Sequence, residues 1–224
     1  LMSLPSWHLV SRRHGRVTGR RNPFVAREGI PFLLASLILI WAAWRYLPDA
    51  WMALPIALTV VLFLVFRDPV RSIPPSALGV VSPVDGKVVE VETVEGGTLL
   101  GKAHRIVIEI DALGTYTARS PVEGTVMNLS SAAGGRPVDY ATNALWIQTD
   151  EGDDVVMGFR GYRFGLPPRA LIRYGERLGQ GQRCAYLRLV RFVELHVPFE
   201  GKVKTEPGRA VVAGSDLVGS VPHH

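Results

Sequence analysis

Cysteine is almost absent from this sequence, since Cys184 is the single one among 224 residues. One cysteine cannot form a disulfide within the chain, which fits a reducing compartment. The sequence also lacks any group of cysteines and histidines with the spacing of zinc ligands. We therefore expect neither an internal disulfide nor a bound metal.

Acidic residues are missing from the first 27 positions, where six arginines precede Glu28. The whole chain has a formal net charge of +5, but the part after these arginines is nearly neutral, with 19 basic and 20 acidic residues. A basic tail beside an apolar segment typically contacts anionic lipid or sets membrane topology, so we expect no nucleic-acid partner. Residues 1–29 are predicted to form a basic disordered tail, because they are polar and interrupted by glycine and proline.

Polar residues are scarce in the two runs that follow, Ile30–Leu47 and Trp51–Phe66. As helices these runs would be roughly 27 Å and 24 Å long, slightly short of the ~30 Å hydrocarbon core of a bilayer. No small-residue cleavage site is evident, which argues against a secretory signal peptide. Residues 30–66 are therefore predicted to form a transmembrane helical hairpin. A buried helical pair in a soluble protein is the alternative.

The flanks of this hairpin predict its orientation. Aromatic residues gather at its turn, as they do at a membrane interface; they are Trp41, Trp44, Tyr46 and Trp51. The arginine-rich tail lies at the opposite end, together with Arg67 and Arg71. Because positive charge favours the cytoplasmic side, we expect an inner (cytoplasmic) membrane protein in which residues 67–224 face the cytoplasm.

Beyond the hairpin, apolar and polar residues alternate with a period of two. In the clearest case, Val193, Leu195 and Val197 alternate with Glu194 and His196. Such alternation, with frequent glycine and proline between the runs, is typical of strands and turns. We predict a mainly β domain, an antiparallel sandwich or barrel-like fold, with Glu194 and His196 on its solvated face.

One short phrase occurs three times in this region, at Ser82–Val88, Ser120–Val126 and Pro198–Val203. Each copy has a proline, an acidic residue, a glycine and then a valine-led strand. Proline fixes φ and glycine adopts positive φ without cost, so each copy is predicted to be a tight turn that starts a strand. The recurrence predicts a domain with related half-units.

Several phrases together resemble the phosphatidylserine decarboxylase family, in its short, membrane-anchored bacterial or archaeal form. The resemblance covers roughly residues 30–219, and its specificity comes from the order and spacing of the phrases. The matching phrases are Phe66–Arg71, Ser82–Val88, Arg119–Gly124, Tyr174–Leu178, Gly181–Arg183, Val193–Pro198 and Gly208–Gly214.

The resemblance implies a self-made cofactor. In the family, the serine of a Gly-Ser bond attacks the preceding carbonyl, and elimination leaves a pyruvoyl group that forms a Schiff base with the substrate amine. A histidine acts as base and an aspartate orients it. The resemblance places Asp85 at the aspartate position, Tyr116 at the histidine position and Val190-Arg191 at the Gly-Ser position.

These replacements remove groups that the chemistry needs. Arginine has no hydroxyl, and tyrosine, with a pKa near ~10, is a poor base at neutral pH. We expect that no pyruvoyl cofactor forms and that the protein keeps the fold and the anchor without decarboxylation. The alternative is an active decarboxylase that uses a displaced serine, at Gly214-Ser215 or Gly219-Ser220.

The arginine at the serine position also predicts a binding site. Arg191 shares the phase of the aliphatic residues of its strand, where an unpaired charge is costly. We expect a cluster of Asp85, Tyr116 and Arg191, either as a structural ion pair or as a site for a lipid phosphate or carboxylate. Further candidates for binding lipid anions are Arg67, Arg71 and Arg119.

The expected partners are membrane phospholipid and either an active homologue or a second copy of the chain. A function of another class is a carrier or membrane adaptor module. Lys87 follows a tight turn, as the modified lysine of lipoyl and biotinyl carrier domains does. The residue before it is Gly86, whereas the carrier motif has methionine or alanine there.

Overall fold

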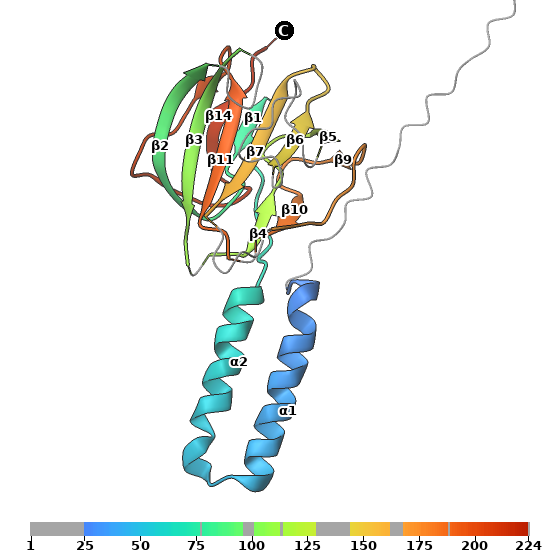
Figure 1. Ribbon diagram of the computed structural model, residues 1–224, viewed down its shortest axis with the longest axis vertical. Coiled ribbons are helices and arrows are strands. Elements are labelled where there is room, and N and C mark those ends of the chain that lie inside the picture. The colour runs from blue at the N-terminus through green and yellow to red at the C-terminus, as the bar shows by residue number, and fades with distance from the viewer. Residues whose placement is uncertain are drawn as a thin grey trace, which may run out of the picture.

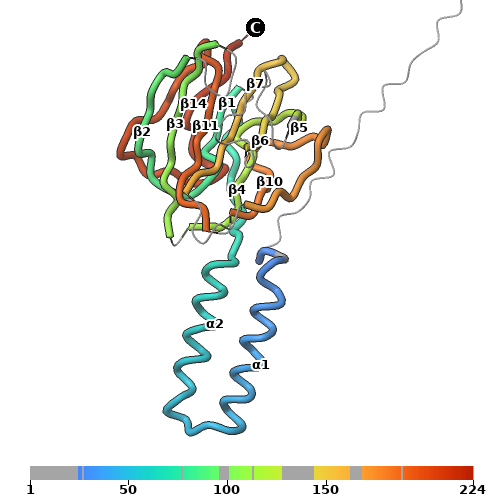
Figure 2. The backbone as a smooth tube through the Cα atoms, viewed as in Figure 1, coloured from blue at the N-terminus to red at the C-terminus, as the bar shows by residue number. Residues whose placement is uncertain are grey.

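The computed structural model describes residues 25–76, 78–95, 101–112, 114–128, 144–161, 168–187 and 189–223. The predicted basic tail therefore lies outside the described residues, apart from its last few positions. Within the described part, a pair of helices stands at one end of a β-rich region, and the C-terminal end of the chain lies at the opposite end of that region (Figures 1 and 2).

The helices form an antiparallel hairpin (Figure 1). Their bounds, with the 3-10 turns before and between them, are η1 (Arg27–Gly29), α1 (Ile30–Tyr46), η2 (Asp49–Trp51) and α2 (Ala53–Phe66). Ser36 and Thr59 donate their hydroxyls to carbonyl oxygens of their own helices, three and four residues back. Neither polar side chain therefore interrupts the apolar surface of the hairpin.

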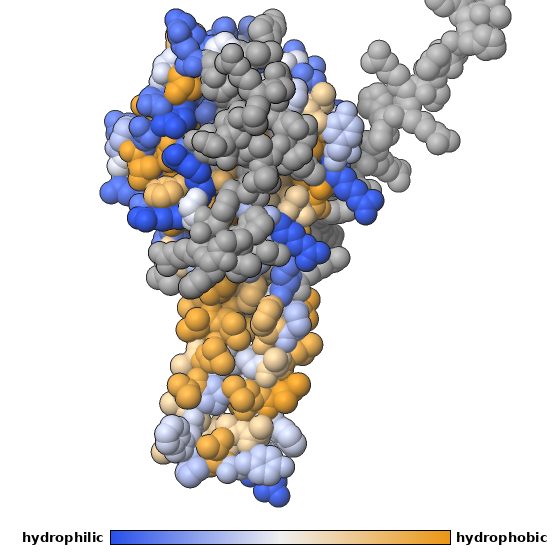
Figure 3. All heavy atoms as spheres, in the orientation of Figure 1, coloured by the Kyte–Doolittle hydropathy of each residue, from blue (hydrophilic) through white to orange (hydrophobic). Residues whose placement is uncertain are grey.

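On the face shown in Figure 3, apolar side chains make up most of the hairpin's surface, with less hydrophobic residues near its turn. In the described chain one helical segment, Asp49–Phe66, is long and apolar enough to cross a membrane, whereas Ile30–Tyr46 is apolar but shorter. The predicted helical hairpin is thus present. The prediction that both of its helices cross a membrane is not established by length and composition.

The rest of the described chain is mainly β, as predicted, and all of its strand pairs are antiparallel. One sheet has eight strands in the order β13-β2-β3-β11-β7-β6-β5-β9, and two smaller sheets have the orders β1-β14-β12 and β4-β10-β8. The strands are β1 (Gly79–Val81), β2 (Gly86–Glu95), β3 (Lys102–Ile110), β4 (Thr117–Arg119), β5 (Gly124–Asn128), β6 (Ala144–Gln148), β7 (Asp154–Arg160), β8 (Arg169–Ala170), β9 (Arg177–Leu178), β10 (Arg183–Tyr186), β11 (Phe192–Pro198), β12 (Lys202–Val203), β13 (Ala210–Val211) and β14 (Leu217–Ser220).

Each of the three repeated phrases starts a strand, namely β2, β5 or β12, at or just after its glycine. A Cβ added at Gly86, Gly124 or Gly201 would lie closer than 3.0 Å to a carbonyl oxygen of the adjacent strand. None of these glycines has positive φ. The sequence argument was therefore wrong about the reason for the glycine, which is the close approach of two backbones.

Two of these turns hydrogen-bond to each other reciprocally. The N–H of Val81 donates to the carbonyl of Pro121, and the N–H of Arg119 donates to the carbonyl of Pro83, at 2.9 Å and 2.8 Å. In both turns the serine hydroxyl donates to the carbonyl two residues further on. The matching hydrogen bonds support the predicted relationship between the two half-units.

Strand β11 lies between β3 and β7, and its aliphatic side chains point into the main apolar core. Its alternate side chains were predicted to be solvated, and that prediction is wrong: Glu194 is 1% exposed and His196 is 3% exposed. Arg105 of β3 and Arg160 of β7 form ion pairs with the Glu194 carboxylate. Alternation separates the two faces of a strand, but it does not show whether the polar face meets water.

Burial at this place predicts a pH effect. It lowers the pKa of His196 to about 4, and the nearby positive charge of Arg105 acts in the same direction. The unfolded chain takes up this proton near pH ~6.5. The stability that comes from keeping His196 neutral in the folded chain is therefore fully present above pH ~6.5. It is lost as the pH falls toward 4, because the unfolded chain binds this proton more tightly than the folded chain does.

From pH 7 to pH 4, we expect the wild-type chain to lose about 2 to 3 kcal/mol more unfolding free energy than the His196→Gln variant. Urea denaturation of both proteins across this range measures the difference, in which carboxylates that titrate in both proteins cancel. Parallel pH profiles for the two proteins would contradict the expectation.

Candidate functional site

Tyr116 and Arg191 line one small pocket, of about 90 Å³, together with the end of β3 and the segment that precedes β11. Because β11 runs antiparallel to β3, the end of β3 and the start of β11 lie together. They do so at the end of the β-rich region that adjoins the helices (Figures 1 and 2). The structure thus brings two of the three predicted site residues to one pocket near the hairpin.

Asp85, the third predicted site residue, lies in the turn before β2 and is surrounded by donors. Its Oδ2 accepts from the guanidinium of Arg71 at 2.7 Å and from the N–H and hydroxyl of Thr115, both at 3.0 Å. Its Oδ1 accepts from the N–H of Ala213 at 2.8 Å. Three of these four donors converge on Oδ2 and one reaches Oδ1, so the carboxylate is held in place from both of its oxygens.

Tyr116 is held by its own loop. Its hydroxyl donates to the carbonyl oxygen of Ala112 at 3.0 Å, four residues earlier in the chain. The phenol therefore points along the wall of the pocket that Ala112 also lines. In this position it is bonded to a carbonyl and is not poised to take a proton from a neighbouring group.

Arg191 does not lie in the apolar phase of its strand, because β11 begins one residue later, at Phe192. Its side chain is 56% exposed, and its Nη2 and Nε lie 3.1 Å and 3.2 Å from Oε1 of Glu109. The guanidinium also lies over the ring of Phe192, 5.0 Å from its centroid. Among the described residues, the ion-pair partner of Arg191 is thus Glu109. The sequence argument expected Asp85 as the partner, and this expectation was wrong.

The other arginines proposed as lipid ligands lie in different surroundings. Arg67, at the end of α2, is exposed, and its backbone pairs with Val25. The guanidinium of Arg71 forms an ion pair with the carboxylate of Asp85. Arg119 is only 2% exposed and cannot reach an external anion without moving. Of these candidates, Arg67 and Arg191 present their charges at the surface.

A buried ion network, which the sequence argument missed, joins the hairpin to the β-rich region. Asp68, two residues after α2, lies 2.6 Å from Nη2 of Arg119 on β4 and 2.9 Å from Nε of Arg183 on β10. Arg119 also donates to the carbonyl oxygens of Pro69 and Gly181, at 3.0 Å and 3.1 Å. This arginine, predicted to bind lipid, instead neutralises the carboxylate that follows the second helix.

The residues behind the alternative functions have clear positions too. Lys87 is the second residue of β2, paired with β3 and β13, and so lies within a sheet rather than at the tip of a turn. The Gly219-Ser220 bond lies in β14, between β1 and β12. The Gly214-Ser215 bond follows Ala213, whose N–H donates to Asp85.

Comparison with known proteins gives a consistent result. The family model described as phosphatidylserine decarboxylase matches residues 58–219. A phosphatidylserine decarboxylase proenzyme of Nitrosomonas europaea is 32% identical over 208 residues, which cover 86% of this chain and 93% of that protein. The proenzyme of Burkholderia ambifaria is 31% identical over 210 residues, with 88% and 96% covered.

Among solved structures, the glucose permease IIA of Mycoplasma capricolum matches with a TM-score of 0.43 and 17% identity. It covers 63% of this chain and 94% of its own. A TM-score this low supports no conclusion about fold or function.

Proposed function

Because the chain belongs to the phosphatidylserine decarboxylase family, we propose that it is a membrane-anchored member that associates with phospholipid and does not perform pyruvoyl-dependent decarboxylation. The observation that carries this proposal is the residue just before β11. Arg191 stands where the family resemblance places the self-cleaving serine, and its side chain is engaged with Glu109. A guanidinium cannot attack the preceding carbonyl as a serine hydroxyl does, so the residues present do not fit a pyruvoyl group.

The position of the pocket supports the association with phospholipid. It lies at the hairpin end of the β-rich region, and the exposed charges of Arg67 and Arg191 belong to that end. The apolar outside of the hairpin favours insertion into the inner (cytoplasmic) membrane. With the β-rich region in the cytoplasm, these arginines would lie near anionic headgroups, which guanidinium groups bind well.

The intact mass of the purified protein tests the loss of self-processing. We expect one uncleaved chain of 24.5 kDa that does not react with a hydrazide, a reagent for ketones. Two fragments, one of them with a blocked and hydrazide-reactive N-terminus, would contradict the proposal. They would favour the alternative, an active decarboxylase.

The second candidate is an active decarboxylase with a displaced serine, and one observation favours Ser215. The hydrogen bond from Ala213 to Asp85 places the Gly214-Ser215 bond beside the family's aspartate position. If fragments are found, Ser215→Ala should abolish them and Ser220→Ala should not, because Gly219-Ser220 lies within a paired strand. The masses of the fragments would identify the cleaved bond directly.

A further inference from the structure

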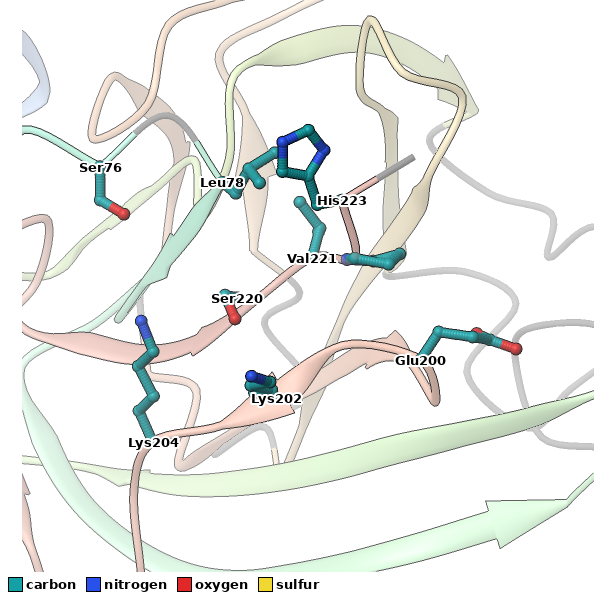
Figure 4. Close-up of a pocket in the computed structure, with 9 residues that line it drawn as sticks. Ser76, Leu78, Glu200, Lys202, Lys204, Ser220, Val221 and His223 are labelled. Carbon is teal, nitrogen blue, oxygen red and sulfur yellow. The ribbon is translucent and has the colours of Figure 1, made fainter.

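A second and larger hollow, of about 690 Å³, lies at the other end of the β-rich region. It is formed by the three-stranded sheet β1-β14-β12 and the chain on either side of it (Figure 4). The chain's C-terminal end lies there, away from the hairpin (Figure 1). Its volume is in the range of ~300 to 1,000 Å³ that small-molecule sites commonly have. The residues that line it are Ser76, Leu78, Glu200, Lys202, Lys204, Ser220, Val221, Pro222 and His223.

The register of the strands places two lysines on one face of this hollow. Lys202 pairs directly with Ser220 of β14, so the two side chains point to the same side of the sheet. Lys204 stands two residues further along the chain and also lines the hollow. Figure 4 shows the side chain of Glu200 directed away from both lysines.

The positive charge of this face is not neutralised within the described chain. Neither Lys202 nor Lys204 forms an ion pair with a described residue, whereas Lys102 is paired with Glu95. The hydroxyls of Ser76 and Ser220 add donors beside the two ammonium groups. A face with two cations and two hydroxyls favours a ligand with several negatively charged acceptor oxygens.

The walls of the hollow add an apolar requirement. Leu78, Val221 and Pro222 stand beside the polar groups, so a ligand that fills the space needs an apolar part next to its charge. We propose that this hollow is a binding site for a phosphate monoester with an apolar body. The site is separate from the pocket of Tyr116 and Arg191, and it does not depend on the function proposed for that pocket.

The phosphate monoester has two possible sources, a soluble molecule and a lipid headgroup such as that of phosphatidic acid. The position of the hollow favours the soluble source. Because the hollow and the hairpin lie at opposite ends of the β-rich region, a membrane that holds the hairpin does not reach the hollow (Figure 1). A lipid could enter it only from a second membrane.

Titration calorimetry of the full-length chain in phosphatidylcholine nanodiscs tests the proposal. Phenyl phosphate is the soluble probe, and inorganic phosphate measures what the phosphate contributes without the apolar body. The test variant is the double substitution Lys202→Gln and Lys204→Gln, and the matched control is Lys87→Gln, an exposed lysine on β2. Vesicles that contain phosphatidic acid form the lipid arm.

We expect phenyl phosphate to bind more tightly than inorganic phosphate, and the double substitution to weaken it about tenfold or more, since two charge-assisted contacts are lost. Higher salt should weaken binding to the wild-type chain, and Lys87→Gln should leave it unchanged. If the vesicles bind in a lysine-dependent way and phenyl phosphate does not bind, the hollow is still a phosphate site, and its ligand is a lipid headgroup. The site is refuted if the double substitution changes neither arm, or if Lys87→Gln has the same effect.

Discussion

Replacing Asp68 by alanine is expected to lower the free energy of unfolding by about 3 to 5 kcal/mol, because it leaves the buried guanidinium of Arg119 without its counter-charge. Arg119 and Arg183 both converge on this carboxylate, and Asp68 itself is fully buried. Removing one partner of a buried pair costs far more than the pair contributes, since the remaining charge stays out of water. Urea denaturation of the full-length protein in detergent micelles measures the loss.

Glu123→Ala is the matched control for this experiment. Glu123 is also paired with an arginine, Arg177, at 3.1 Å, but both side chains are about half exposed. An exposed pair of this kind contributes at most about 1 kcal/mol. Equal losses in the two variants would show that the buried network does not stabilise the junction between the hairpin and the β-rich region.

Gly86→Ala is expected to destabilise the protein by about 3 kcal/mol, the upper end of what overpacking usually costs. The added methyl would collide with the carbonyl of Glu109, a backbone group in the adjacent strand β3 that cannot rotate away. Relief requires the two strands to separate, which weakens the hydrogen bonds between β2 and β3. Thermal unfolding followed by circular dichroism provides the measurement.

Gly158→Ala separates this effect from the substitution itself. Gly158 lies in β7, another strand of the same sheet, and a Cβ there would have its nearest neighbours at 4.0 Å. This is ordinary van der Waals contact, so we expect little change or a slight gain in stability, because alanine restricts the unfolded chain more than glycine does. A loss as large as that of Gly86→Ala would refute the explanation by backbone approach.

Local patterns were sufficient to predict the elements of this fold. The two apolar runs became helices, with α1 beginning at Ile30 and α2 ending at Phe66 as expected. The repeated turn phrases became the starts of strands, because proline fixes φ locally and glycine lets the neighbouring backbone approach. The antiparallel pairing and the inward face of β11 follow from the same short-range alternation.

The surroundings of the candidate site could not be predicted in this way, because they depend on residues far apart in the chain. Three of the residues that hold Asp85 are Arg71, Thr115 and Ala213, which stand 14, 30 and 128 positions away. Arg191 pairs with Glu109 and not with the expected Asp85. The alternation pattern placed Arg191 within the strand, whereas β11 begins one residue later, at Phe192. Glu194 is buried because arginines of two neighbouring strands pair with it, and no pattern within β11 contains that information.

The pairing of β1 with β14 has a consequence for the order of events during synthesis. Gly79, in the first described strand, pairs with Ser220, in the last one, so this sheet cannot close until residue 220 has left the ribosome. The apolar hairpin emerges well before that point. With the membrane anchoring proposed above, the hairpin would insert while the β-rich region is still incomplete, because contacts between distant residues form late. The β-rich region would then fold as a chain that is already tethered at one end.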